Sequence, residues 1–275
     1  MSGPCYEKLQ SVKNSLLKPF FQAEIVFLEN SNMTSGQLAR VSRNFAAGLP
    51  FAKKLREDTI FITSDVDLFI FNKAAVLPDE KRFDEMSVLF ADETIHFYNN
   101  HTTRLKFRDL TFTMFNMGTI AANLSVWRDI MDIKNSDVVN GEYIEKAIQK
   151  VYGDEFAIKN KHKMFNWYLD QHFFSLKFHK YLEKNAGRIH YKFYGRPRRL
   201  DRGNWKYSPD FLIRLNTLEY DDAHLDPAIF DKANWGRIWS LYKRIFGSGQ
   251  IVALNEFRNE VIEHVNEEDV KDVHP

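Results

Sequence analysis

Apolar residues occur in two patterns along the chain, and each pattern predicts one kind of secondary structure. Runs of consecutive β-branched and aromatic residues predict four strands, at 23–30, 60–71, 87–95 and 110–122. Apolar positions three or four residues apart predict five helices, at 37–55, 125–133, 141–151, 166–182 and from 251 onward. The run at 60–71, IFITSDVDLFIF, is dense enough to be a central strand covered on both faces. The order of strand, helix and strand at 23–30, 37–55 and 60–71 predicts two parallel strands joined by a helical crossover, as in an α/β fold.

Length and composition fit an ordinary globular protein. The 275 residues are 44% hydrophobic and 27% charged, and we predict one domain over 1–250 followed by a C-terminal helix and acidic tail over 251–275. The formal net charge of +1 excludes a globally basic nucleic-acid-binding protein, so no nucleic-acid partner is expected. Cys5 is the single cysteine and cannot form an internal disulfide. Because no run of 18 or more apolar residues occurs, no membrane span is expected.

Two carboxylates interrupt the most apolar stretch of the chain. Asp65 and Asp67 are one residue apart, and side chains with that spacing on a strand lie on the same face. Two ionised carboxylates on one face repel each other unless a cation lies between them. A divalent Mn²⁺ or Mg²⁺ that also binds a substrate diphosphate would remove the repulsion. The alternative is a turn in which both carboxylates simply face water.

Four short motifs follow one another in an order that suggests an enzyme family. They are SDVDLFIF, TMFNMGTIAANLSVW, FNWYLDQHFF and DDAHLDP. In order and spacing, over about residues 37–236, they resemble the retaining, glycogenin-like GT-A glycosyltransferases. The resemblance implies a Rossmann-type, mostly parallel sheet flanked by helices. It also implies transfer of a hexose or pentose, with retention, from a nucleotide-sugar donor (UDP in preference to GDP) to a hydroxyl of a glycan, protein or lipid.

The resemblance also implies a role for each matching residue. The metal ligands would be Asp65, Asp67 and His224, and the residues beside the donor sugar would be Asp170 and Gln171. The residues that contact the donor would be Arg43, Asp65, Asn116 and Gly118.

The chain departs from the family pattern in two places. The family's late His is followed by Gly and Lys, whereas His224 is followed by LDPAIFDKANW, in which Lys232 and Arg237 are the nearest cations. AEIVFLEN is the only predicted strand before the one that carries Asp65 and Asp67. We therefore expect a fold without a complete N-terminal nucleotide-binding strand, through truncation or a divergent start. A truncated eukaryotic luminal domain would belong to the Golgi or ER lumen, and a whole chain to the cytoplasm.

Three other functions stay open at this point. A haloacid-dehalogenase-like phosphatase would use Asp65 as nucleophile and the Asp221–Asp222 pair for magnesium, although Phe69 stands where that family has Thr or Val. A catalytically inactive GT-A-like binding module is the second. A nucleic-acid-binding protein that uses the basic run at 187–206 is the third. Trp205, in that run, would either stack on an acceptor sugar or anchor its loop.

Overall fold

A computed structural model shows a mixed α/β chain that divides into two compact units. It describes residues 4–21, 23, 25–29, 31–77, 86–89, 104–115, 117–153, 167–185, 191–194, 198–200, 219–224 and 232–264. One unit comprises residues 1–27, 200–219 and 224–275, and the other comprises residues 28–199 and 220–223. Position 250, where the sequence predicts a boundary, lies within helix α11 (Ser248–His264).

The described elements of the first unit are mainly helical. Helix α1 (Pro4–Val12) continues into a π-helix (Lys13–Phe21), and helix α10 (Lys232–Ile245) precedes α11. The Gln250 side chain in α11 donates from Nε2 to the Phe20 carbonyl over 2.7 Å, which ties the two ends of the chain together within this unit. Helix α10 is an element that the apolar pattern does not predict. No helix among the described residues is long and apolar enough to cross a membrane.

The second unit is built around a four-stranded sheet in the order β1-β6-β3-β7. The strands are β1 (Ile60–Ser64), β6 (Thr119–Asn123), β3 (Met86–Leu89) and β7 (Tyr191–Tyr194). Strand β6 runs antiparallel to both β1 and β3, whereas β3 and β7 are parallel. All five residues of β6 are buried, so the covered central strand is β6. The smaller sheets are β2 (Leu68–Ile70) with β9 (Asp222–His224) and β8 (Arg199–Leu200), and the hairpin β4 (Arg104–Phe107) with β5 (Leu110–Thr113).

The prediction of one buried central strand over 60–71 is wrong. Strand β1 ends at Ser64, and β2 begins at Leu68 after a turn in which the Leu68 N–H donates to the Asp65 carbonyl over 3.2 Å. Ile62, in the middle of β1, is 38% exposed, so this strand is not covered on both faces. The physical reason is the carboxylate pair, because a turn lets Asp65 and Asp67 stay partly solvated whereas a continuous buried strand would not.

The prediction of a first strand at 23–30 is also wrong for the residues that the structure describes there. Residues 25–29 form no strand, and the segment is held instead by helix α5 (Gly141–Tyr152). The Gly141 N–H donates to the Glu29 carbonyl over 3.0 Å, and the Asn32 N–H donates to the Glu145 carboxylate over 2.7 Å. The predicted parallel pair is therefore absent from the described strands, and β1 pairs with β6 instead. The prediction of a Rossmann-type, mostly parallel sheet is also wrong for the described strands, because two of the three pairings in the main sheet are antiparallel.

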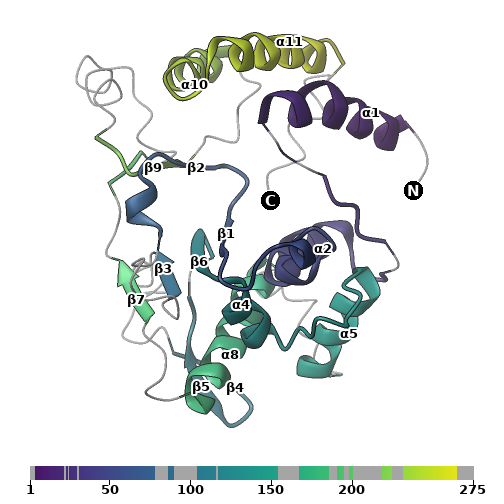
Figure 1. Cartoon of the computed structure of the whole chain (residues 1–275), viewed down its shortest axis with the longest axis vertical. Coiled ribbons are helices and arrows are strands. Elements are labelled where there is room, and N and C mark those ends of the chain that lie inside the picture. Colours follow the sequence, from purple (N-terminus) through teal and green to yellow (C-terminus); the bar gives the residue numbers. More distant parts are fainter. Residues whose placement is uncertain are drawn as a thin grey trace. The chain divides into compact units, whose positions relative to one another are not determined.

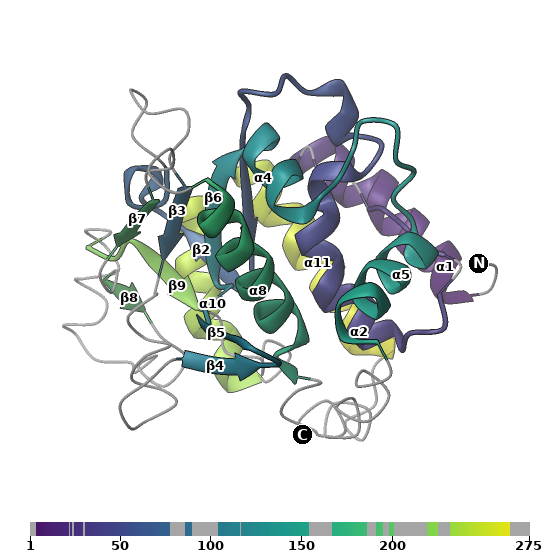
Figure 2. The same ribbon diagram turned by 90° about the horizontal axis from the view of Figure 1, so that it is seen from below.

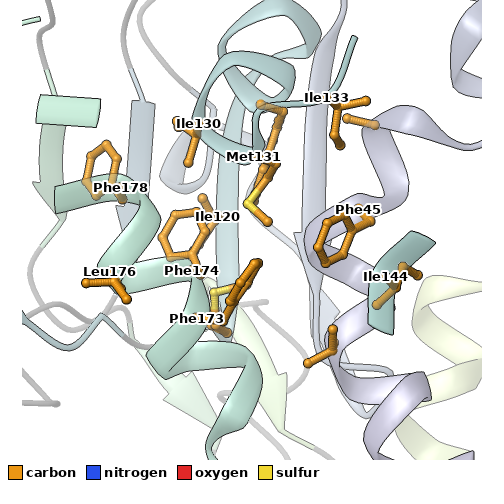
Figure 3. Packing of buried hydrophobic residues seen from close by; sticks show 14 of the residues in the cluster. Phe45, Ile120, Ile130, Met131, Ile133, Ile144, Phe173, Phe174, Leu176 and Phe178 are labelled. Carbon is orange, nitrogen blue, oxygen red and sulfur yellow. The ribbon is translucent and has the colours of Figure 1, made fainter. Parts of the chain in front are cut away.

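Helices close the second unit around its core. They are α2 (Ser35–Ser42), which runs into 3₁₀ helices at Arg43–Gly48 and Ala52–Lys54, α4 (Leu124–Met131), α5 and α8 (Leu169–Lys184). Helix α4 packs against β1 and β6, and α8 packs against α4 (Figure 1). The β4–β5 hairpin lies beside α8, and α2 lies beside α5 (Figure 2). Phe45, Ile120, Met131 and Phe173 converge from four of these elements in the buried core (Figure 3).

Candidate metal centre

The predicted carboxylate pair lies in the turn that follows strand β1. Asp65 comes directly after Ser64, the last residue of β1, and its N–H donates to the Gly118 carbonyl over 3.1 Å. The Ser64 hydroxyl donates to the same carbonyl, also over 3.1 Å. Asp67 follows Val66, which is fully exposed at the tip of the turn. The chain just before β6 therefore fixes where this turn sits.

Arg43 joins Asp65 to a second carboxylate from a distant part of the chain. Its Nη1 pairs with Asp65 Oδ1 and also donates to the Met117 carbonyl over 3.1 Å, and its Nη2 pairs with Asp170 Oδ2. The Asp170 side chain is 2% exposed, compared with 37% for Asp65. Burial lowers the pKa of Arg43, but the attraction of Asp170 and of Asp65 outweighs it and holds the pKa above its ordinary value. Arg43 is therefore a permanent cation between two carboxylates.

Helix α8 and its neighbours hold Asp170 in place. Asp170 stands in the first turn of α8, where the partial positive charge of the helix N-terminus favours a carboxylate. The buried Asn44, next to Arg43, donates from Nδ2 to the Asp170 carbonyl over 3.0 Å. The Phe115 N–H donates to the Ser175 hydroxyl over 2.8 Å, which ties α8 to the segment that leads into β6. The Arg43–Asp170 contact thus rests on fixed backbone at both ends.

His224 completes a group of three possible metal ligands. It is the last residue of β9, which pairs with β2, the strand that begins directly after Asp67. Asp65, Asp67 and His224 each offer one ligand atom, and these atoms lie within 4.8 Å of one another. The three residues are all partly exposed, as a site that admits an ion and a substrate requires. Since a carboxylate has two oxygens, Asp65 can contact Arg43 and a cation at the same time.

The residue types gathered at this site suit a divalent cation. Three carboxylates (Asp65, Asp67 and Asp170) and one guanidinium (Arg43) together carry a charge of −2. Oxygen ligands suit Mg²⁺ and Mn²⁺, and an imidazole nitrogen also binds transition metals, so the donor set fits Mn²⁺ well and Mg²⁺ acceptably.

Of the other residues that the sequence singles out, the structure describes Gly118 and Gln171. Gly118 lies against Asp65, because its carbonyl accepts the hydrogen bond from the Asp65 N–H. Gln171 follows Asp170 on α8 and is half-buried, but neighbouring residues on a helix point in different directions, so it does not share the Arg43 contact. Asn116, Trp205 and the side chains of Lys232 and Arg237 lie outside the described residues.

Asp221 and Asp222, the magnesium pair that a phosphatase would need, are engaged in ion pairs. Asp222 is buried and accepts two hydrogen bonds from Arg199, of 2.7 Å and 2.8 Å. Asp221 accepts from the Asn72 amide over 2.9 Å and from the Arg198 N–H over 3.1 Å. Burial raises the pKa of Asp221, but these hydrogen bonds from Asn72 and Arg198 outweigh it and hold the pKa below its ordinary value. Both carboxylates thus join the β8 and β9 segments.

Sequence reasoning names Arg43 and Asp170 separately and misses that they form a pair. The signal that could have suggested it is Asn44, a polar residue that falls between the apolar positions of the 37–55 helix and proves fully buried. Comparison of the chain with protein-family models, with curated proteins and with solved structures gives no match.

Proposed function

We propose that this chain is a metal-dependent glycosyltransferase that moves a sugar from a nucleotide-sugar donor to an acceptor hydroxyl. The observation that carries the proposal is the approach of ligand atoms from Asp65, Asp67 and His224 to within 4.8 Å of one another. These residues come from two separate motifs of the family resemblance, which the fold brings together. When bound, Mn²⁺ or Mg²⁺ would act as a Lewis acid toward the departing diphosphate.

The surrounding residues have positioning roles in this proposal. Arg43 holds the Asp65 carboxylate in one orientation, because the same guanidinium is fixed by Asp170 and by the Met117 carbonyl. Asp170 is too buried to reach a sugar in this arrangement, so we assign its effect to Arg43 rather than to direct contact with the donor. Gly118 places the chain before β6 against the Asp65 turn.

The finer features of the resemblance belong to the same proposal. Strand β1 ends directly before the Asp-x-Asp turn, which supports a variant GT-A fold with a strand-ending metal site. Transfer with retention, a UDP-linked donor, and a glycan, protein or lipid acceptor complete the proposal. A Golgi or ER luminal location goes with it if the chain is part of a luminal enzyme.

The phosphatase alternative has weaker support from the same geometry. Its nucleophile, Asp65, is paired with Arg43, and its magnesium pair, Asp221 and Asp222, is engaged with Arg198 and Arg199. A covalent phosphoenzyme on Asp65, trapped with a phosphate mimic, would nevertheless establish it.

Calorimetric titration of UDP and GDP, with and without Mn²⁺, tests the proposal. We expect one nucleotide to bind wild type only when Mn²⁺ is present, and Asp67→Asn to lose that binding. Asp58→Asn is the matched control, because Asp58 is an exposed carboxylate that pairs with Arg56 beside the start of β1. Failure of both nucleotides to bind wild type with Mn²⁺ would refute the proposal. A donor screen with the nucleotide that binds would then identify the sugar.

A further inference from the structure

Two neighbouring contacts join helix α2 to the start of helix α8. The Arg40 guanidinium carbon lies 4.4 Å from the centroid of the Trp167 ring, and Arg43 pairs with Asp170. Arg40 and Arg43 are three residues apart in helical backbone, and Trp167 and Asp170 are three residues apart where α8 begins. Arg40 and Arg43 lie on one face of this helical stretch, so the Trp167 contact lies beside the Asp170 contact, although Trp167 itself precedes α8, which begins at Leu169.

Trp167 is unusually exposed for a side chain of its size. It is 46% exposed, whereas Trp127, by comparison, is fully buried in the core of the same unit. Arg40 covers one face of the indole through a cation–π contact, which holds the ring in place. A ligand that stacks on Trp167 would use the part of the ring that stays exposed. A ring that is already held loses little conformational freedom when a ligand binds to it.

The chemistry of this surface suits a sugar ring. An indole face is large and apolar, as is the C–H face of a pyranose, so the two can pack face to face. Because nearly half of the indole stays exposed, it fits a ligand that binds weakly and leaves readily. The nucleotide, in contrast, is expected to be held mainly through the cation at Asp65 and Asp67.

We propose that Trp167 is a stacking platform for the acceptor sugar and thereby contributes to acceptor specificity. The inference rests on the proposed glycosyltransferase function, since it assigns the second substrate of the same site. Trp167 is not one of the candidate metal ligands: it contacts Arg40, whereas Asp65 is paired with Arg43.

Saturation-transfer difference NMR on the full chain tests the platform directly. The probes are the methyl glycosides of glucose, galactose, mannose, xylose and N-acetylglucosamine, each measured with wild type, Trp167→Ala and Trp167→Phe. We expect at least one glycoside to bind through its ring C–H protons, with affinity reduced about fivefold or more in Trp167→Ala and partly retained in Trp167→Phe. Val138→Ala is the control, since it truncates another exposed apolar residue in the same unit and is expected to change nothing.

The outcomes separate this inference from the proposed function. Asp67→Asn is expected to keep glycoside binding, because stacking on Trp167 needs no cation. If no glycoside binds wild type, or if Trp167→Ala binds as wild type does, the platform is refuted, whatever the result of the nucleotide titration. If Trp167→Ala instead loses Mn²⁺-dependent UDP or GDP binding, the indole contacts the nucleobase and the acceptor assignment is wrong. Glycoside binding that depends on Trp167, in a chain that binds neither nucleotide, would uphold the platform and reject the transferase.

Discussion

Replacing Arg43 by Met tests whether the buried Arg43–Asp170 pair beside the candidate metal centre stabilises the folded protein. Met keeps most of the length and apolar volume of the side chain but removes its charge and donors. The Arg43 side chain is 20% exposed and that of Asp170 is 2% exposed, so the Asp170 carboxylate would be left inside the protein without its cation. Removal of one partner of a buried pair costs about 3–5 kcal/mol of the free energy of unfolding. At 37% exposure, Asp65 can exchange Arg43 for water, so its share of the loss should be only about 0–1 kcal/mol.

A double-mutant cycle isolates the pair. Asp170→Asn keeps the shape of the side chain without its charge, and the double variant Arg43→Met, Asp170→Asn should be more stable than Arg43→Met alone. We expect a coupling energy of about 2–3 kcal/mol between the two residues, measured by urea unfolding at pH 7 and followed by circular dichroism. A matching cycle with Asp65→Asn should give a markedly smaller coupling energy.

Arg56→Met is the control for this experiment. Arg56 pairs with Asp58, and because both side chains are largely exposed, the loss of this pair should leave the stability nearly unchanged. The reasoning fails if Arg43→Met is no less stable than Arg56→Met, or if the Arg43–Asp170 coupling is no larger than the Arg43–Asp65 coupling.

Two further predictions concern the frame around the site. Asp221→Asn should be less stable than wild type by about 1–2 kcal/mol at neutral pH, because it loses charge-assisted hydrogen bonds from Asn72 and Arg198. Since folding lowers the pKa of Asp221, its contribution is present above the ordinary pKa of about 3.9 and is lost as the pH falls through the lower pKa of the folded state, so urea unfolding of the two proteins should converge below that pKa. Gly141→Ala should lower the melting temperature, because an added Cβ would lie 2.4 Å from the Glu29 carbonyl oxygen, and an unchanged melting temperature would contradict that close approach.

Helices with a long apolar period could be predicted from the sequence. The predicted helix at 141–151 is α5 (Gly141–Tyr152), and the one at 166–182 is α8 (Leu169–Lys184). In α5 one apolar face repeats along the helix and is buried against the core, whereas α8 is apolar enough to be buried on most sides, so in both cases local pattern and tertiary packing agree. The predicted helix at 37–55 is present but is not one continuous α-helix, since α2 passes into a 3₁₀ helix at Arg43.

Strand predictions failed where apolar density alone carried them. The run at 60–71 contains enough apolar residues for one buried strand, but such density does not distinguish a continuous strand from two short strands that flank a turn. A second error occurred at 23–30, where an apolar segment predicted as a strand lies beside α5 without any strand partner among the described residues. Pairing depends on what lies alongside in three dimensions, and the apolar pattern does not contain that information.

The candidate site shows the same division between local and long-range information. The closeness of Asp65 and Asp67 could be predicted, although a turn rather than strand alternation brings them together. Arg43 and Asp170 are 127 residues apart in the sequence, and their contact depends on how α2 packs against α8, so no local pattern predicts it. The exposure of Trp167 could not be predicted either, because an aromatic residue at helical spacing is normally expected in the core.

Direct measurement of Mn²⁺ binding tests the central claim, which is that Asp65, Asp67 and His224 hold a divalent cation. The electron paramagnetic resonance signal of free Mn²⁺ falls as the ion binds, so titration of wild type, Asp67→Asn, His224→Ala and the control Asp58→Asn gives four affinities. We predict one site in wild type and in Asp58→Asn, weakened about tenfold or more in each of the two ligand variants. Equal affinity in wild type and Asp67→Asn, or no Mn²⁺ bound by wild type, would contradict the account.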